Sequence, residues 1–180
     1  MVYVFFADGF EEVEAITPVD YLRRAGIPVE TVGVFGTEVT GAHNITIKCD
    51  RTMENVSESA LPDMIVLPGG MPGVTNLAKS EKLLKIINLC FENNKFIAAI
   101  CAAPTILAEL GILKGKTATC FPSMANLMES TDYVNMPVVR DKNFITSRAA
   151  GSAEQFALEL ISVLKGKDCA QKIHGAIFAR

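Results

Sequence analysis

The sequence predicts an α/β fold in which helices cover both faces of a parallel sheet. Strand-like and helix-like segments alternate along all 180 residues, without an internal linker, repeat or low-complexity stretch. The run Met64-Ile65-Val66-Leu67 is continuously apolar, as expected of a strand that is buried on both faces. With 49% hydrophobic and 21% charged residues, the composition suits one globular domain over residues 1–180.

Each element is predicted from its apolar periodicity and its flanking turn residues. The predicted strands are residues 2–7, 29–34, 38–40, 44–49, 64–67, 96–100, 117–120, 138–139 and 144–146. The predicted helices are residues 11–25, 80–93, 104–110, 153–164 with Ser152 as cap, and 168–179. In the first of them, the apolar positions recur at three-residue steps: Val13, Ile16, Val19 and Leu22. Segments 38–40 and 44–49 are expected to pair antiparallel, segments 138–139 and 144–146 to form a hairpin, and residues 121–136 to be irregular or partly helical.

Composition excludes several classes of function. The net charge is −3 and no basic run occurs, so we expect no dedicated nucleic-acid site. No apolar run approaches the roughly 18 residues of a membrane span, and no signal peptide precedes the first strand, so we expect a cytoplasmic protein. The five cysteines form no C-x-x-C motif and the two histidines stand far apart, so we predict no disulfide framework, no metal site and no cofactor.

A cysteine stands at the corner between a predicted strand and a predicted helix. The apolar run of residues 96–100 ends at Cys101, with Ala99 and Ala103 two residues to either side. Such a corner exposes its central side chain and requires small neighbours. Because the free N–H groups of the next helical turn favour negative charge, we expect a thiolate with a lowered pKa. A buried core cysteine is the ordinary alternative.

Carboxylates follow the first strand and start the first helix. Glu11 and Glu12 suit the helix dipole, and no further role is expected of them. Glu14 lies one turn further in, where its carboxyl can face the thiol, hold a proton and act as acid or base. Spacing alone leaves this role and a structural role equally open. His43 and His174 are expected to be ordinary surface histidines.

Two glycines follow the apolar strand at residues 64–67. Ligands of parallel sheets bind at the carboxyl ends of the strands, where this loop, the Glu14 segment and Cys101 can converge. The amides of Gly69 and Gly70 would then complete an oxyanion hole with that of Ala102, and a simple tight turn is the alternative. The loop lacks the spacing of either glycine-rich nucleotide motif, which excludes nucleotide binding.

Five segments, in this order, closely resemble the ThiJ/PfpI family, and the resemblance covers nearly the whole chain. They are Asp8-Gly9-Phe10-Glu11-Glu12-Val13-Glu14, Arg23-Arg24-Ala25-Gly26, Val66-Leu67-Pro68-Gly69-Gly70, Ala98-Ala99-Ile100-Cys101-Ala102-Ala103-Pro104 and Thr146-Ser147-Arg148. The sequence is most similar to the parkinsonism-associated deglycase group and its bacterial relatives. The resemblance implies a flavodoxin-like fold of the class I glutamine amidotransferase type, a homodimer, and a nucleophile-elbow cysteine.

The family's pattern also implies roles for individual residues. Glu14 would be a protonated carboxyl that is hydrogen-bonded to the Cys101 thiol. Gly70 and Ala102 would supply backbone amides to the substrate oxygen. Arg24 and Arg148 match family arginines near the site or the dimer contact.

Three departures from the pattern bear on function. The protease-like branch has a histidine where this chain has Ala102, which argues against a peptidase. Deglycase-type relatives often have a histidine at the position of Phe121, so proton transfer would fall to Glu14. The family's Gly-Pro is Ala149-Ala150 here, which leaves the details of the dimer contact open.

The sequence thus predicts a cysteine-dependent glyoxalase or protein deglycase. Its substrates would be methylglyoxal, glyoxal or early glycation adducts, attacked by Cys101 with Glu14 moving the proton. The alternative is a redox-sensing or stress-response chaperone whose reactive cysteine is oxidised without physiological catalysis.

Overall fold

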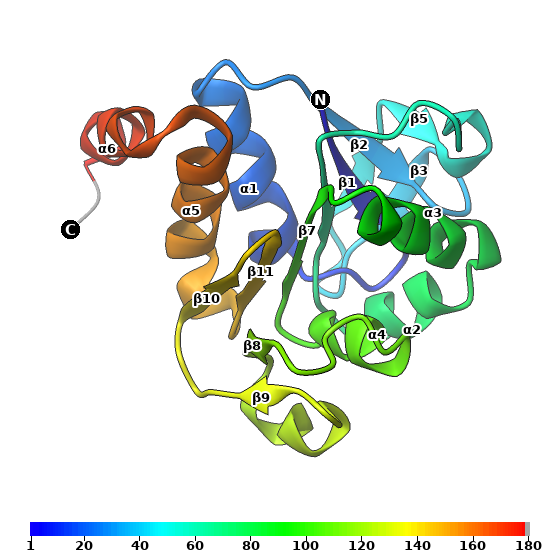
Figure 1. Cartoon of the computed structure of the whole chain (residues 1–180). Helices are drawn as coiled ribbons and strands as arrows, with labels where there is room; N and C mark the ends of the chain where they lie inside the picture. The colour runs from blue at the N-terminus through cyan, green and yellow to red at the C-terminus, as the bar shows by residue number, and fades with distance from the viewer. Residues whose placement is uncertain (179–180) are drawn as a thin grey trace.

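A computed structural model describes residues 1–178 and shows one central sheet between two layers of helices (Figure 1). Its strands are β1 (Val2–Phe6), β2 (Val29–Gly33), β5 (Arg51–Thr52), β6 (Met64–Leu67), β7 (Phe96–Ile100), β10 (Val138–Asp141) and β11 (Phe144–Ser147). They lie in the order β10-β11-β7-β6-β1-β2-β5. All neighbouring strands are parallel except β10 and β11. The predicted α/β class with a mainly parallel sheet is confirmed.

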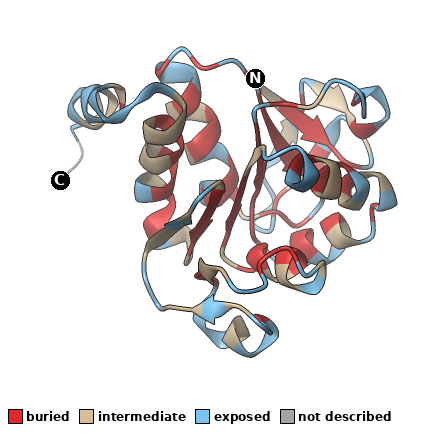
Figure 2. Ribbon diagram, in the orientation of Figure 1, coloured by how far each residue is buried: buried red, intermediate tan, exposed pale blue. Residues whose placement is uncertain are grey.

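Two hydrophobic clusters bury the two faces of this sheet. The helices are α1 (Glu12–Arg24), α2 (Gly73–Ala78), α3 (Glu81–Glu92), α4 (Pro104–Glu109), α5 (Ala153–Lys165) and α6 (Lys167–Ala176). Side chains of α1 and α5 cover one face, and side chains of α2, α3 and α4 cover the other. The strands between them are almost wholly buried (Figure 2). Helix α6 packs on the outer side of α5, away from the sheet.

Smaller elements flank the sheet. The antiparallel pair β3 (Glu38–Thr40) and β4 (Thr46–Lys48) confirms the predicted excursion, and β8 (Thr117–Ala118) pairs parallel with β9 (Asp132–Tyr133). Short 3-10 helices occupy Met53–Asn55, Pro122–Leu127 and Ala150–Ser152. No helix within residues 1–178 combines the length and the apolar character needed to cross a membrane.

Several sequence expectations need correction. Helix α2 was not predicted, and the last residue of the predicted helix 168–179 lies outside the described residues. The side chain of Ser152 does not cap α5 but bonds Ser147 and the Ala149 backbone. In α1, Val13 and Ile16 are 50% and 40% exposed, because the buried face runs through Glu14, Ala15, Pro18, Val19 and Leu22.

The carboxyl ends of β1, β6, β7 and β11 meet at one edge of the sheet. Backbone hydrogen bonds fasten the loops that follow these strands to one another. Glu11 donates its N–H to the Gly69 carbonyl at 2.9 Å, and Cys101 donates its N–H to the Ser147 carbonyl at 2.9 Å. Both bonds join residues that are far apart in the sequence, so distant segments share one site.

Candidate functional site

Cys101 occupies the corner between β7 and α4. Its φ angle is +63°, a left-handed conformation that a residue with a side chain adopts only when its surroundings enforce it. The enforcing contacts are the N–H bond to Ser147 and a bond from the Phe121 N–H to the Cys101 carbonyl, at 2.7 Å. The side chain is partly exposed, whereas Ala102 and Ala103 beside it are buried. This backbone presents a thiol at the carboxyl edge of the sheet.

Glu14 brings a carboxyl group to this thiol from the first turn of α1. The residue is only 1% exposed, and its carboxyl interacts with the Cys101 side chain. Glu14 Oε2 also accepts the Gly69 N–H at 3.1 Å, and the Ala150 amide acts on the same carboxyl. The helix starts here because Glu11 Oε2 caps it by accepting the Glu14 N–H at 2.8 Å.

Gly69 and Gly70, in the loop after β6, contact different groups of the site. Gly69 packs between the pair, because a Cβ there would collide with the Glu14 carboxylate and would lie 2.6 Å from the Cys101 Cβ. Its N–H donates to Glu14 Oε2, so this group supports the acid, and a part for Gly69 in an oxyanion hole stays a prediction. The backbone N–H groups of Gly70 and Ala102 do act on the Cys101 side chain. These two amides can stabilise negative charge beside the sulfur.

The protonation of the pair differs from the sequence expectation. Burial raises the pKa of Glu14 to about 7. Burial, and next the negative charge of Glu14, raise the pKa of Cys101 to about 12. The expected lowering of the Cys101 pKa is therefore wrong while Glu14 is ionised, because the amides of Ala102 and Gly70 do not offset these effects. The Cys101 sulfur can become an anion when its proton passes to Glu14, which then donates a hydrogen bond instead of repelling charge.

The structure separates the two predicted arginines. Arg24 lies ten residues after Glu14, about 15 Å further along α1, and its Nε donates to Asp20 at 2.6 Å. It therefore does not belong to the site within one chain. Arg148 follows β11 directly after Ser147, at the edge of the site, and its guanidinium bonds Asn135 at 3.1 Å.

Sequence reasoning missed the contributions of the end of β11 and of the loop that follows it. The Ser147 carbonyl holds the Cys101 N–H, and the Ala150 amide acts on Glu14. The Ser147 and Ser152 hydroxyls bond each other at 2.8 Å and fix this loop. A small-residue loop after a predicted strand was the available signal, but the sequence does not show which backbone groups reach the thiol.

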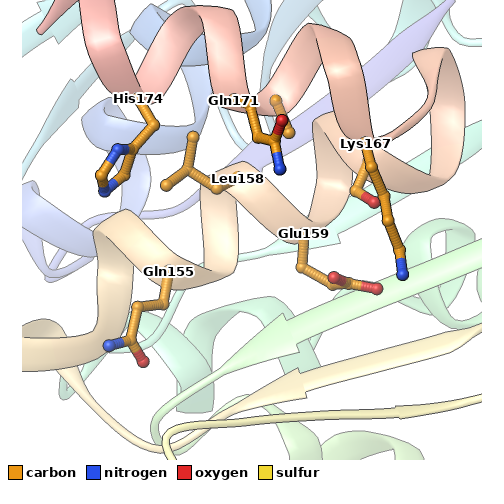
Figure 3. A pocket seen from close by; sticks show the side chains of 8 residues that line it. Gln155, Leu158, Glu159, Lys167, Gln171 and His174 are labelled. Carbon is orange, nitrogen blue, oxygen red and sulfur yellow. The ribbon is translucent and has the colours of Figure 1, made fainter.

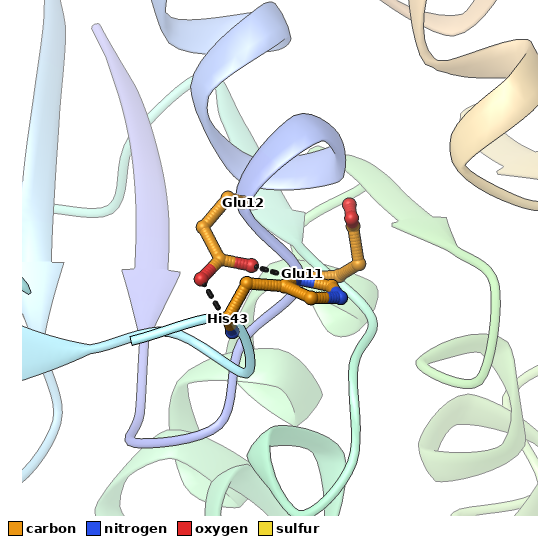
Figure 4. Close-up of side chains that lie close together, drawn as sticks. All are labelled: Glu11, Glu12 and His43. Atoms are coloured by element: carbon orange, nitrogen blue, oxygen red, sulfur yellow. Dashed lines mark hydrogen bonds and ion pairs between the residues drawn. The ribbon is translucent and has the colours of Figure 1, made fainter. Parts of the chain in front are cut away.

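An ion pair between the nearly buried Glu12 carboxylate and the exposed His43 ring lies at the start of the same helix (Figure 4). Glu12 is 7% exposed, contrary to the expectation of a simple dipole interaction, and it accepts hydrogen bonds from the backbone and the ring of His43. Ligand-type atoms of Glu11, Glu12 and His43 lie within 4.8 Å of one another. Both Glu12 oxygens and one Glu11 oxygen already accept hydrogen bonds, and the positive end of α1 disfavours a cation. The arrangement is an ion pair rather than a metal site.

An open groove lies elsewhere, between α5 and α6 (Figure 3). It has a volume of about 590 Å³ and is widely open to solvent. Its lining residues are Gln155, Leu158, Glu159, Ser162, Lys167, Ala170, Gln171 and His174. None of them belongs to the thiol site, so the groove adds nothing to its chemistry.

The chain is similar to known proteins along its whole length. The model of the DJ-1/PfpI family matches residues 1–163. Protein dj-1beta of Drosophila melanogaster is 38% identical over 94% of this chain and 92% of the relative, and its crystal structure superposes with a TM-score of 0.95 at 37% identity, covering 99% of this chain and 97% of that one.

Two further proteins bear on the site. A deglycase of Pyrococcus abyssi is 32% identical over 91% of this chain and 99% of the relative. A structure of Toxoplasma gondii DJ-1, described as oxidized, is 34% identical with a TM-score of 0.94, covering 98% of this chain and 97% of that one. From the family match and these relatives, we conclude that the chain belongs to the DJ-1/PfpI family.

Proposed function

We propose that the protein is a cysteine-dependent glyoxalase or protein deglycase acting on methylglyoxal, glyoxal or early glycation adducts. The observation that carries the proposal is the contact of the partly exposed Cys101 thiol with the buried Glu14 carboxyl. A carboxyl with a pKa of about 7 can both accept and return a proton near neutral pH. The two amides beside the sulfur supply the complementary stabilisation of an oxyanion.

The reaction begins at the aldehyde carbon of the substrate. The Cys101 proton passes to the Glu14 carboxylate as the sulfur bonds to this carbon, and the carbonyl electron pair moves to oxygen. The Gly70 and Ala102 amides stabilise that oxygen until Glu14 protonates it, which gives a hemithioacetal.

The later steps convert this adduct into a hydroxy acid. Glu14 removes the proton from the former aldehyde carbon and returns it to the neighbouring carbon, so that one carbon is oxidised and the other reduced. The resulting thioester is hydrolysed by water, which releases lactate from methylglyoxal or glycolate from glyoxal and restores the thiol. Atoms and electrons balance with water as the only co-reactant.

The comparisons support an enzyme of this kind, since relatives that match nearly the whole chain are named deglycases. A peptidase is not proposed, because Ala102 stands where the protease-like branch has its histidine. Arg148, at the edge of the site, is proposed to contact the substrate. No cofactor is required by this chemistry.

Replacement of the nucleophile tests the proposal. Cys101→Ser should abolish lactate formation from methylglyoxal in the purified protein. Cys169→Ser is the matched control, because Cys169 is also partly exposed but lies on α6. Unchanged turnover in the Cys101 variant would refute the mechanism.

A second candidate function is redox sensing by the same thiol. Two observations favour it: Phe121 leaves the site without the histidine of many deglycase-type relatives, and a similar DJ-1 has a structure described as oxidized. Mild peroxide followed by mass spectrometry should then oxidise Cys101 selectively, with negligible aldehyde turnover. Uniform oxidation of all five cysteines would count against this function.

We also propose that the protein is a cytoplasmic homodimer. The exposed Val13 and Ile16 side chains of α1 lie on a helix face that a folded monomer leaves in water. Ile16 borders a groove together with Ile47 of β4, which extends this apolar surface. Contiguous apolar surface is typical of a protein contact. Arg24, at the end of the same helix, would then belong to the dimer contact rather than to its own site.

A further inference from the structure

The loop between β3 and β4 is fastened to the first turn of α1, the turn that also carries Glu14 (Figure 4). His43 donates its backbone N–H to Glu12 Oε1 at 2.7 Å, and its ring Nδ1 lies 2.7 Å from Glu12 Oε2. Ala42 donates its N–H to the Phe10 carbonyl at 2.8 Å. A glycine is needed at position 41, because a Cβ on Gly41 would collide with the Glu12 carboxylate. Backbone and side-chain contacts together fix the imidazole in place.

Glu12 and His43 differ in exposure, and they form an ion pair when the imidazole is protonated. The Glu12 side chain is nearly buried, whereas the His43 side chain is 69% exposed. Burial acts to raise the pKa of Glu12, but the hydrogen bonds from His43 outweigh it and hold that pKa below its usual range. The same contact raises the pKa of His43. An ionised Glu12 accepts the Nδ1 proton, which leaves Nε2 free to gain or lose a proton near neutral pH.

Glu11 lies between this imidazole and the thiol site. One of its carboxylate oxygens is within 4.8 Å of ligand-type atoms of Glu12 and His43, and its Oε2 accepts the Glu14 N–H at 2.8 Å. In the described part of the chain, the charged groups that act on His43 are Glu12 and then Glu11. Burial raises the pKa of Glu14, and the negative charge of Glu11 raises it further. In the same way, burial and then the negative charge of Glu14 raise the pKa of Cys101. Asp8 lies in the neighbouring loop, and its Oδ1 accepts the Thr40 N–H at 2.9 Å.

We propose that His43 is a positioning residue whose charge makes the reactivity of Cys101 depend on pH. Protonated His43 offsets the negative charges of Glu11 and Glu12, so that the Cys101–Glu14 pair can hold a negative charge of its own. When His43 loses its proton, the negative charges of the two glutamates are no longer offset, which disfavours an anion on the Cys101–Glu14 pair. The inference rests on the proposed function and deepens it by naming what regulates the same site.

Alkylation of Cys101 by iodoacetamide, followed by mass spectrometry across pH, tests this inference without any substrate. His43→Gln should slow alkylation roughly three- to tenfold at pH 6, where the wild-type imidazole is charged. At pH 9 the two proteins should react equally, because the imidazole is then neutral. His174→Gln is the matched control, since His174 is the other histidine and lies on α6. The proposal would be overturned if His43→Gln and the wild type were alkylated at the same rate at pH 6. It would also be overturned if the variant were slower by the same factor at pH 6 and pH 9.

A second variant keeps the imidazole and removes its partner. Glu12→Gln should move the His43-dependent part of the profile to lower pH, because the bond that raises the pKa of His43 is weakened. An unmoved profile would contradict the proposal, and so would a wild-type profile that changes when a chelator is added, which would assign the effect to a bound cation. Absence of methylglyoxal turnover would refute the proposed function alone.

Discussion

The Gly69 backbone N–H donates to Glu14 Oε2 at 3.1 Å, and this bond holds the buried acid against the thiol. Glu14 lies in the first turn of α1 and Gly69 in the loop after β6, 55 positions apart in the sequence. The absence of a side chain at Gly69 leaves the space in which the Glu14 carboxyl meets Cys101. The space left by the missing side chain therefore allows the Glu14 carboxyl to approach the thiol.

Gly69→Ala should therefore separate the pair. Its methyl group would collide with the Glu14 carboxylate, and overpacking of this kind typically costs about 1–3 kcal/mol of stability. We expect a loss of methylglyoxal turnover of roughly tenfold or more, because the catalytic groups are displaced, measured beside urea denaturation. Gly151→Ala is the control, because a Cβ there would meet no atom within 4 Å. Equal losses in the two variants would argue against a special role of Gly69.

Glu14 should make folding stability depend on pH. Its pKa rises from 4.5 to about 7 on folding, so between these values the folded state keeps a proton that the unfolded state loses. The contribution of Glu14 to stability should fall by on the order of 3 kcal/mol as pH rises through this window, and should not change further above it. Denaturation at a series of pH values should show that Glu14→Gln removes this fall, while Glu92→Gln, at an exposed position, retains it. A fall that persists in Glu14→Gln would assign it to another group.

Much of the fold could be predicted because it depends on local pattern. Continuous apolar runs identified β6 and β7, and the periodicity of residues 80–93 identified α3. The short α2 was missed because its sequence, Gly73–Ala78, shows no extended apolar periodicity. The exposure of Val13 and Ile16 was also missed, since three-residue steps drift around a helix and packing against α5 selects the buried face.

The site was only partly predictable, because its contacts cross the sequence. The positions of Cys101 and Glu14 followed from turn and helix signals. The direction of the Cys101 pKa did not, because a local dipole argument omits burial and the charge of a distant glutamate. The ionised, nearly buried Glu12 is paired with His43, which lies 31 residues away. The segment around His43 contains no sequence motif that would have predicted this contact.

Phe121→His should increase turnover. The Phe121 side chain is 40% exposed and its backbone holds the Cys101 carbonyl, so an imidazole can replace the ring without loss of that bond. A second proton-transfer group should raise kcat for methylglyoxal at least tenfold. Phe91→His, on α3 and also 40% exposed, is the matched control. No gain in the Phe121 variant would show that Glu14 alone suffices for proton transfer.

Ile16→Lys should dissociate the proposed dimer. A charge in the centre of an apolar contact is costly to bury, whereas the same side chain in a monomer would be solvated. Analytical ultracentrifugation at micromolar concentration should show a monomer for this variant and a dimer for the wild type. Leu127→Lys, at a position 53% exposed outside α1, should remain dimeric. A dimer that survives Ile16→Lys would place the contact elsewhere.

The central claim is that Glu14 controls the proton of Cys101. The pH dependence of Cys101 alkylation, compared between the wild type and Glu14→Gln, measures this most directly. As Glu14 ionises near pH 7, it becomes able to accept the thiol proton, so wild-type alkylation should accelerate through that pH. At pH 7.5 it should exceed the rate of Glu14→Gln by at least about tenfold. An equal or faster rate in Glu14→Gln would contradict the account.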